Sequence, residues 1–259
     1  MRFGVCASPA QARLLADAGY DYIELAAGND LLPEEDDAAW AEKRRAIEAL
    51  PLLPETFNLF VRGLKIVGPE ADSTRLRRYV ERILARAAQV GGQIIVFGSG
   101  GARNIPDGFP QEQAQRQIET FLGYCADASD RTGVVVAIEP LRRVESNILN
   151  LVSEGAALAR RIARPGVRAL ADTFHMEAEN EPLSVLAASA DVLAHTHTAD
   201  TGRLAPGTGS YDHIAFFRAL RAAHYDARLS IECGWKDFAA EIGPALAHLR
   251  SAHAAAQAG

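Results

Sequence analysis

The chain reads Leu193-Ala-His-Thr-His-Thr-Ala-Asp-Thr-Gly-Arg-Leu-Ala-Pro-Gly-Thr-Gly-Ser210, a short strand-like run followed by a glycine-rich loop with one arginine. Neighbouring side chains of a strand point to opposite faces, so His195 and His197 line the same face. Three further apolar runs each end in one carboxylate: Val134-Val-Val-Ala-Ile-Glu139, Val167-Arg-Ala-Leu-Ala-Asp172 and Leu229-Ser-Ile-Glu232. A hydrophobic core alone does not need four consecutive strands that end in Glu, Asp, His and Glu. These strand ends therefore indicate a functional site.

Strand-like and helix-like segments alternate along the rest of the chain. The strand-like runs recur about every 25 to 40 residues, which is the size of one βα unit. The predicted strands cover residues 3–6, 22–25, 56–61, 94–97, 134–139, 167–172, 193–198 and 227–232. The longer predicted helices cover residues 33–50, 73–90, 110–132, 153–163, 182–190, 212–223 and 237–255.

Eight βα units in a chain of this length favour an α/β fold of the (β/α)8 TIM-barrel type. The alternative is a doubly wound open sheet, but no Gly-x-Gly-x-x-Gly motif follows the first strand. No linker or change of composition marks a second domain, so residues 1–259 are expected to form one TIM-barrel domain. The alanine-rich tail from about residue 251 looks dispensable.

The composition excludes several classes of protein. The 259 residues are 48% hydrophobic and 23% charged, as in an ordinary globular protein. A net charge of -6 argues against a nucleic-acid surface. Apolar runs of at most five or six residues are too short to cross a membrane. Three widely spaced cysteines and an N-terminus that leads directly into a strand predict a cytoplasmic protein without a signal peptide.

The active site of a TIM barrel lies at the carboxyl ends of its strands, where Glu139, Asp172, His197 and Glu232 are expected to meet. Three unpaired carboxylates would repel one another in a pocket of low dielectric constant. One divalent cation removes this repulsion. A ligand set of one imidazole and three carboxylates suits Mn²⁺ best, and Mg²⁺, Co²⁺ and Zn²⁺ stay open.

The alternative is that each carboxylate is neutralised separately by a nearby arginine or a helix N-terminus. The available arginines are Arg142, Arg143, Arg168 and Arg203. His195 lies one layer below His197 and is expected to be an internal hydrogen-bonded support. The histidines of the helical stretches are expected at the surface: His213, His224, His248 and His253.

These motifs resemble those of the sugar phosphate isomerase/epimerase group of xylose-isomerase-like TIM barrels. The D-tagatose/D-psicose 3-epimerases are the most similar in motif. The matching residues are Ile138-Glu139-Pro140 with Glu145 and Asn147, Asp172-Thr-Phe-His175, His195-Thr-His197 with Arg203-Leu-Ala-Pro-Gly207, and Ile231-Glu232. The first half of the chain matches in strand order only, and Asp200 and Gly202 lie where the epimerases vary.

The resemblance implies a single metal ion bound by Glu139, Asp172, His197 and Glu232. It implies that Glu139 and Glu232 also act as the catalytic acid and base. The substrate-binding residues that it implies are Glu145, His175 and Arg203.

A metal that chelates a ketone oxygen and the neighbouring hydroxyl acidifies the C–H bond between them. Proton removal on one face and return on the other would epimerise C3 of a 2-ketose or ketose phosphate. The open alternatives are an aldose–ketose or hydroxypyruvate-type isomerase, a dehydratase or C-glycoside-cleaving lyase, and a non-catalytic sugar-binding barrel. An endonuclease IV-like function is disfavoured by the few site histidines and the negative charge.

The ligand itself is less well defined by the sequence. A phosphate could bind at residues 206–210 with help from Arg103, or these residues form a plain glycine turn. The expected partner is a small sugar or sugar phosphate, and a homo-oligomer stays open.

Overall fold

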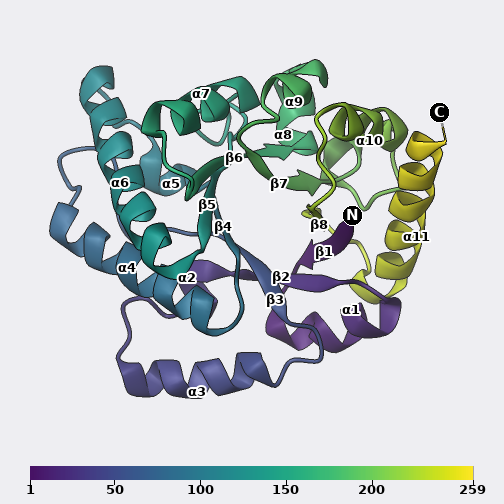
Figure 1. Cartoon of the computed structure of the whole chain (residues 1–259), viewed down its shortest axis with the longest axis horizontal. Coiled ribbons are helices and arrows are strands. Elements are labelled where there is room, and N and C mark those ends of the chain that lie inside the picture. Colours follow the sequence, from purple (N-terminus) through teal and green to yellow (C-terminus); the bar gives the residue numbers. More distant parts are fainter. Residues whose placement is uncertain (259) are drawn as a thin grey trace.

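The eight strands pair in parallel and in chain order, and the last one closes onto the first (Figure 1). The computed structural model describes residues 1–258. The strands are β1 (Arg2–Cys6), β2 (Tyr22–Ala26), β3 (Pro54–Asn58), β4 (Ile94–Phe97), β5 (Val135–Ile138), β6 (Val167–Asp172), β7 (Leu193–Thr198) and β8 (Arg228–Ile231). The predicted TIM barrel is therefore confirmed.

Helices surround this barrel (Figure 1). The longer ones are α1 (Ala12–Ala18), α3 (Asp37–Glu48), α4 (Ser73–Gln89), α6 (Gln111–Thr132), α7 (Val152–Ile162), α10 (His213–Ala222) and α11 (Phe238–Gln257). Four of them begin after an aspartate whose carboxylate accepts an N–H of the first turn: Asp36, Asp72, Asp212 and Asp237. The cap at Asp36 starts α3 later than residue 33, where the sequence predicts it.

Short helices follow three of the strands directly: α2 (Ala27–Asp30), α5 (Gly100–Arg103) and α8 (Thr173–Ala178). They were not predicted, because segments of four to six residues are too short to show a helical period. The predicted helix 182–190 is reduced to α9 (Ser184–Ala188). The short helices lie in the loops at the carboxyl ends of the strands, where they shape the mouth of the barrel.

The interior of the barrel has an apolar half and a polar half. Its apolar half is a small buried cluster from β4, β5 and β6: Ile94, Val96, Ala137 and Leu170. Its polar half comes from β2, β3, β7 and β8 and holds the buried side chains of Tyr22, Glu24, Thr56, His195 and Ser230. The inward orientation of His195 was predicted from strand alternation, whereas Glu24 was not recognised.

The C-terminal tail is part of the core. Helix α11 continues to Gln257 and buries Ala252 and Ala256. The ring of His253 packs edge-on against Phe3 and Phe217, with centroids 6.1 and 5.2 Å apart. The expectation that this tail is dispensable is therefore corrected. No helix within residues 1–258 is both long and apolar enough to cross a bilayer.

We expect the substitution Ala256→Asp to lower the free energy of unfolding by about 2–4 kcal/mol, because it buries a carboxylate without a partner. The matched control is Ala254→Asp, since Ala254 is exposed on the same helix turn. The control is expected to change stability by less than about 0.5 kcal/mol. Urea unfolding measures both values, and equal effects would show that the tail does not pack as described.

Candidate metal centre

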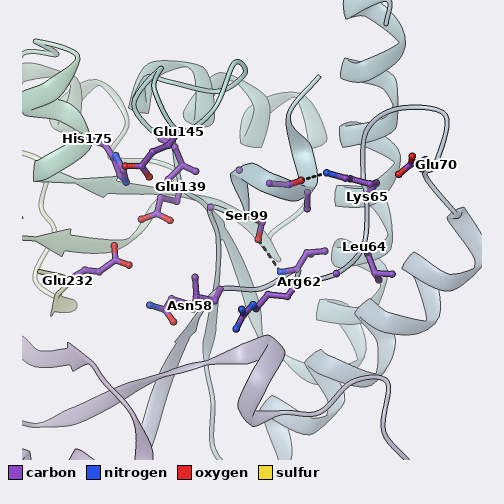
Figure 2. A pocket seen from close by; sticks show the side chains of 18 of the residues that line it. Asn58, Arg62, Leu64, Lys65, Glu70, Ser99, Glu139, Glu145, His175 and Glu232 are labelled. Carbon is purple, nitrogen blue, oxygen red and sulfur yellow. Dashed lines mark hydrogen bonds between the residues drawn. The ribbon is translucent and has the colours of Figure 1, made fainter. Parts of the chain in front are cut away.

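The carboxyl ends of four neighbouring strands bring the four predicted ligands together. Glu139 follows β5, Asp172 ends β6, His197 lies near the end of β7 and Glu232 follows β8. One donor atom from each residue lies within 4.8 Å of the donor atoms of the other three. Figure 2 shows the carboxylates of Glu139 and Glu232 turned toward one another at one end of the cavity. The geometry therefore matches what one bound cation requires.

His197 is at the centre of this group and is completely buried. Its Nδ1 atom lies 3.2 Å from Glu139 Oε1, 3.4 Å from Glu232 Oε2 and 3.9 Å from Asp172 Oδ2. Burial alone would lower the pKa of His197, but Glu24 and the carboxylates around Nδ1 raise it well above its usual value. A positive charge is thus strongly favoured at this position.

The surroundings of Asp172 show whether these residues suit a bound metal. Its Oδ1 atom accepts the N–H of Phe174 at 2.8 Å, which caps α8. Its Oδ2 atom is buried and has no hydrogen-bond partner within the described residues 1–258. Burial raises the pKa of Asp172 to about 6. This buried carboxylate oxygen, which has no partner among residues 1–258, lies close to an imidazole and two other carboxylates. A divalent cation bound among these groups would stabilise its negative charge.

The alternative of separate neutralisation finds support at two of the four residues. Asp172 Oδ1 caps the N-terminus of α8, although Asp172 Oδ2 has no partner within residues 1–258. Arg203 Nη2 lies 3.0 Å from Glu232 Oε2. The other three arginines have different partners in the part of the chain that the structure describes. Arg142 pairs with Glu145, Arg143 pairs with Glu179, and Arg168 donates to the carbonyls of Pro165 and Asp191.

The predicted substrate-binding residues lie beside the four ligands. His175 is buried, its Nδ1 accepts the N–H of Arg142 at 3.2 Å, and its Nε2 lies 3.9 Å from Asp172 Oδ2. Glu145 accepts a hydrogen bond from Arg142 Nε at 2.6 Å. The ring of Phe174 holds two guanidinium groups, because the Cζ atoms of Arg142 and Arg203 lie 4.6 and 4.8 Å from its centroid. Arg203 is thereby aimed at Glu232.

A cavity of about 590 Å³ connects these side chains (Figure 2). Glu139, Glu145, His175, Arg203 and Glu232 line one part of it, and Arg62, Lys65 and Glu70 line the opposite part. A second cavity of about 450 Å³ opens toward β1 and β2 and shares Asn58, Leu59, Arg203 and Glu232 with the first. The two cavities therefore meet beside Glu232.

Glu24 is the site residue that the sequence analysis missed. It lies in the middle of β2, is completely buried, and binds both histidines of the 195–197 motif. One signal was available: a carboxylate inside a buried strand, two residues after Tyr22 and therefore on the same face.

The glycine loop after β7 is built around Asp200. The Asp200 carboxylate accepts the N–H groups of Thr201, Gly207 and Tyr211 at 2.8–2.9 Å. These amides are therefore already occupied and are not free for a phosphate. Arg103, the other predicted phosphate contact, is completely buried and donates to the carbonyls of Phe97 and Leu149. Its predicted role at a phosphate site is wrong, because the buried guanidinium donates to backbone carbonyls and does not reach the surface.

Replacing Asp200 by asparagine is expected to lower the free energy of unfolding by about 1–3 kcal/mol, because asparagine keeps one acceptor oxygen but lacks the second oxygen and the negative charge that the three amides face. Burial would raise the pKa of Asp200, but the amides of residues 201–211 lower it. Its stabilisation is therefore present above about pH 4 and is lost as the pH falls through the lowered value. Asp212→Asn is the control, since asparagine caps a helix equally well. Denaturant unfolding should show a smaller difference between Asp200→Asn and the wild type at pH 3 than at pH 7, and a difference that does not depend on pH would contradict this role.

The protein is thus a (β/α)8 barrel in which three carboxylates and one imidazole at the carboxyl ends of β5–β8 could hold one metal ion. The profile of the xylose isomerase-like TIM barrel family matches residues 12–252. The chain belongs to this family, and the resemblance seen in the motifs is confirmed.

Two characterised relatives are sugar epimerases. The 3-dehydro-D-guloside 4-epimerase of Escherichia coli is 30% identical over 64% of this chain and 67% of that protein. The D-psicose 3-epimerase of Agrobacterium fabrum is 28% identical over 84% of this chain and 76% of that protein. The solved 3-keto-D-glucoside 4-epimerase of E. coli superposes with a TM-score of 0.81 at 26% identity, covering 97% of this chain and 99% of that one. These relatives support a sugar epimerase function within the isomerase class of enzymes.

Proposed function

We propose that the protein is a divalent-metal-dependent sugar epimerase that inverts C3 of a 2-ketose. One observation carries the proposal. Glu139 and Glu232 lie at the same end of the cavity with their carboxylates turned toward one another, and both belong to the group of donor atoms within 4.8 Å that also includes Asp172 and His197. A sugar-binding barrel without catalysis would not need two such carboxylates beside the bound ligand.

Glu139, Asp172, His197 and Glu232 would hold the metal, with His197 binding through Nδ1. A divalent cation in this place would polarise the ketone and neighbouring hydroxyl oxygens and stabilise the negative charge that develops there. The hard oxygen ligands favour Mn²⁺, and Mg²⁺, Co²⁺ and Zn²⁺ accept the same set.

The proton transfer is the work of the two glutamates. One carboxylate takes the proton from C3, and the electron pair of that C–H bond moves onto the ketone to give an enediolate. The other glutamate, as a carboxylic acid, returns a proton to C3 from the opposite face and restores the ketone. Arg203, His175 and Glu145 would hold substrate oxygens during both steps, since all three line the same cavity.

The occupied amides around Asp200 favour a free sugar over a sugar phosphate. The cytoplasm is the proposed location, and the three free cysteines agree with a reducing compartment.

A second candidate is inversion of C4 in a 3-keto glycoside, which is the same chemistry one carbon further along. The relative of E. coli carries this activity in its name. The cavity also extends past the glutamates to Arg62, Lys65 and Glu70, which leaves room for a second sugar unit.

Both candidates are tested by incubating the metal-loaded protein with free 2-ketoses, their phosphates and 3-keto glycosides, and analysing the products by NMR. We expect a C3 epimer from a free ketose, no product after treatment with a chelator, and recovery when Mn²⁺ is added back. A C4 epimer from a glycoside would select the second candidate. An aldose product would replace epimerisation by isomerisation, and no conversion of any of these sugars would contradict the proposal.

A further inference from the structure

A carboxylate lies directly below the candidate metal centre and takes no part in the proposed proton transfer. Glu24 is completely buried inside the barrel. Its Oε1 atom lies 3.0 Å from His197 Nε2, and its Oε2 atom lies 2.9 Å from His195 Nε2. A single carboxylate thus contacts both histidines of the His195-Thr-His197 motif.

Two hydroxyl groups fix the orientation of this carboxylate. Thr56 Oγ1 and Ser230 Oγ both donate to Glu24 Oε2 at 2.6 Å. Tyr22 Oη lies 2.8 Å from Ser230 Oγ and holds that hydroxyl from behind. Because these contacts come from β2, β3 and β8, the carboxylate is held by the rigid wall of the barrel and not by a loop.

The hydrogen bonds determine which nitrogen of each ring carries a proton. An ionised carboxylate only accepts hydrogen bonds, so both histidines must donate through Nε2–H. With its Nε2 committed to Glu24, His197 can offer only Nδ1 to a cation. This nitrogen is the one that faces Glu139, Glu232 and Asp172.

We propose that Glu24 is the positioning residue of the metal centre: it fixes the ring orientation and protonation of His197 so that Nδ1 is presented to the cation. The inference rests on the proposed function, since it assumes that the four mouth residues bind a metal. It also explains the spacing of the motif, because the second imidazole, His195, anchors the Glu24 carboxylate from below. Partners that orient a metal-binding histidine typically change metal affinity by about 10- to 100-fold when they are replaced.

The test compares Glu24→Gln with Glu55→Gln by calorimetric titration of the metal-free proteins with Mn²⁺. Glutamine at position 24 keeps the shape but loses the charge and one acceptor, so the Kd should rise by about 10- to 100-fold. Glu55 pairs with Arg2 and Arg228 and does not contact His195 or His197, so the same substitution there should change the Kd by less than about threefold. Equal affinity of Glu24→Gln and wild type would overturn the proposal. If Glu24→Gln does not fold, Glu24→Asp replaces it: the retained charge on a shorter side chain should give a smaller but measurable loss of affinity, and wild-type affinity would again overturn the proposal.

A spectroscopic measurement separates positioning from general stability. In Zn²⁺-loaded protein with ¹⁵N-labelled histidine, His197 should show a protonated Nε2 that exchanges slowly with water and an unprotonated Nδ1. A His195→Gln variant assigns the signals. In Glu24→Gln the Nε2 proton should exchange faster, and an Nδ1-protonated ring in the wild type would refute the assignment. If the wild type binds no divalent metal, the proposed function fails, and the slow Nε2 proton of the metal-free protein still decides whether Glu24 holds this ring.

Discussion

Replacing Glu232 by glutamine is expected to lower kcat for epimerisation by about 10²- to 10⁴-fold, the usual contribution of a positioned acid or base. Burial would raise the pKa of Glu232, but the hydrogen bond from His197 and the charge of Arg203 lower it to about 2. Glu232 is therefore ionised at neutral pH and able to accept a proton. Glutamine retains an oxygen that can bind a metal but cannot take up the proton.

The control for this prediction is Glu145→Gln, which alters the same cavity without touching the four proposed ligands. It should raise KM, with a smaller effect on kcat than Glu232→Gln. Steady-state kinetics on the identified ketose measure both values. A Glu232→Gln variant with bound metal and wild-type kcat would show that Glu232 is neither acid nor base.

The double variant Glu139→Gln, His197→Ala is expected to lose its metal. Wild-type protein should carry about one divalent ion per chain, and the variant less than about one tenth of that. The substitutions remove the imidazole and one charge from a group whose donor atoms all lie within 4.8 Å of one another. Elemental analysis after dialysis measures the stoichiometry.

His224→Ala is the control for metal loss, because His224 is an exposed histidine outside the site. This control should keep the full stoichiometry. Retention of stoichiometric metal by the double variant would mean that the cation binds elsewhere and that the centre has been assigned wrongly.

The strands of the site were predictable because each is a short apolar run that ends in a residue able to bind a metal. Glu139, Asp172, His197 and Glu232 are all at or next to a strand terminus, and the closure of a parallel barrel brings such termini together. Strand alternation also placed His195 one layer below His197, where it is buried and contacts Glu24.

Other features depend on packing between distant segments. A carboxylate inside a buried strand was a local signal for Glu24, but its contacts with His195 and His197 arise only from the closure of the barrel. His213 was expected at the surface, but it is buried and its Nδ1 lies 3.2 Å from His248 Nε2, since α10 packs on α11. Arg103 likewise reads as a loop cation in the sequence and becomes a buried donor only through the carbonyls around it.

Exchange with solvent deuterium measures directly whether a proton is removed from C3 and returned to it. The metal-loaded protein is incubated in D₂O with D-psicose, or with whichever 2-ketose it converts, and the products are followed by NMR. We expect deuterium at C3 of the inverted product, because the returning proton comes from a glutamate that exchanges its proton with water. We also expect the label to disappear in Glu232→Gln. Deuterium at C1, or inversion at C3 with full retention of the original hydrogen, would contradict the removal and return of a C3 proton by Glu139 and Glu232.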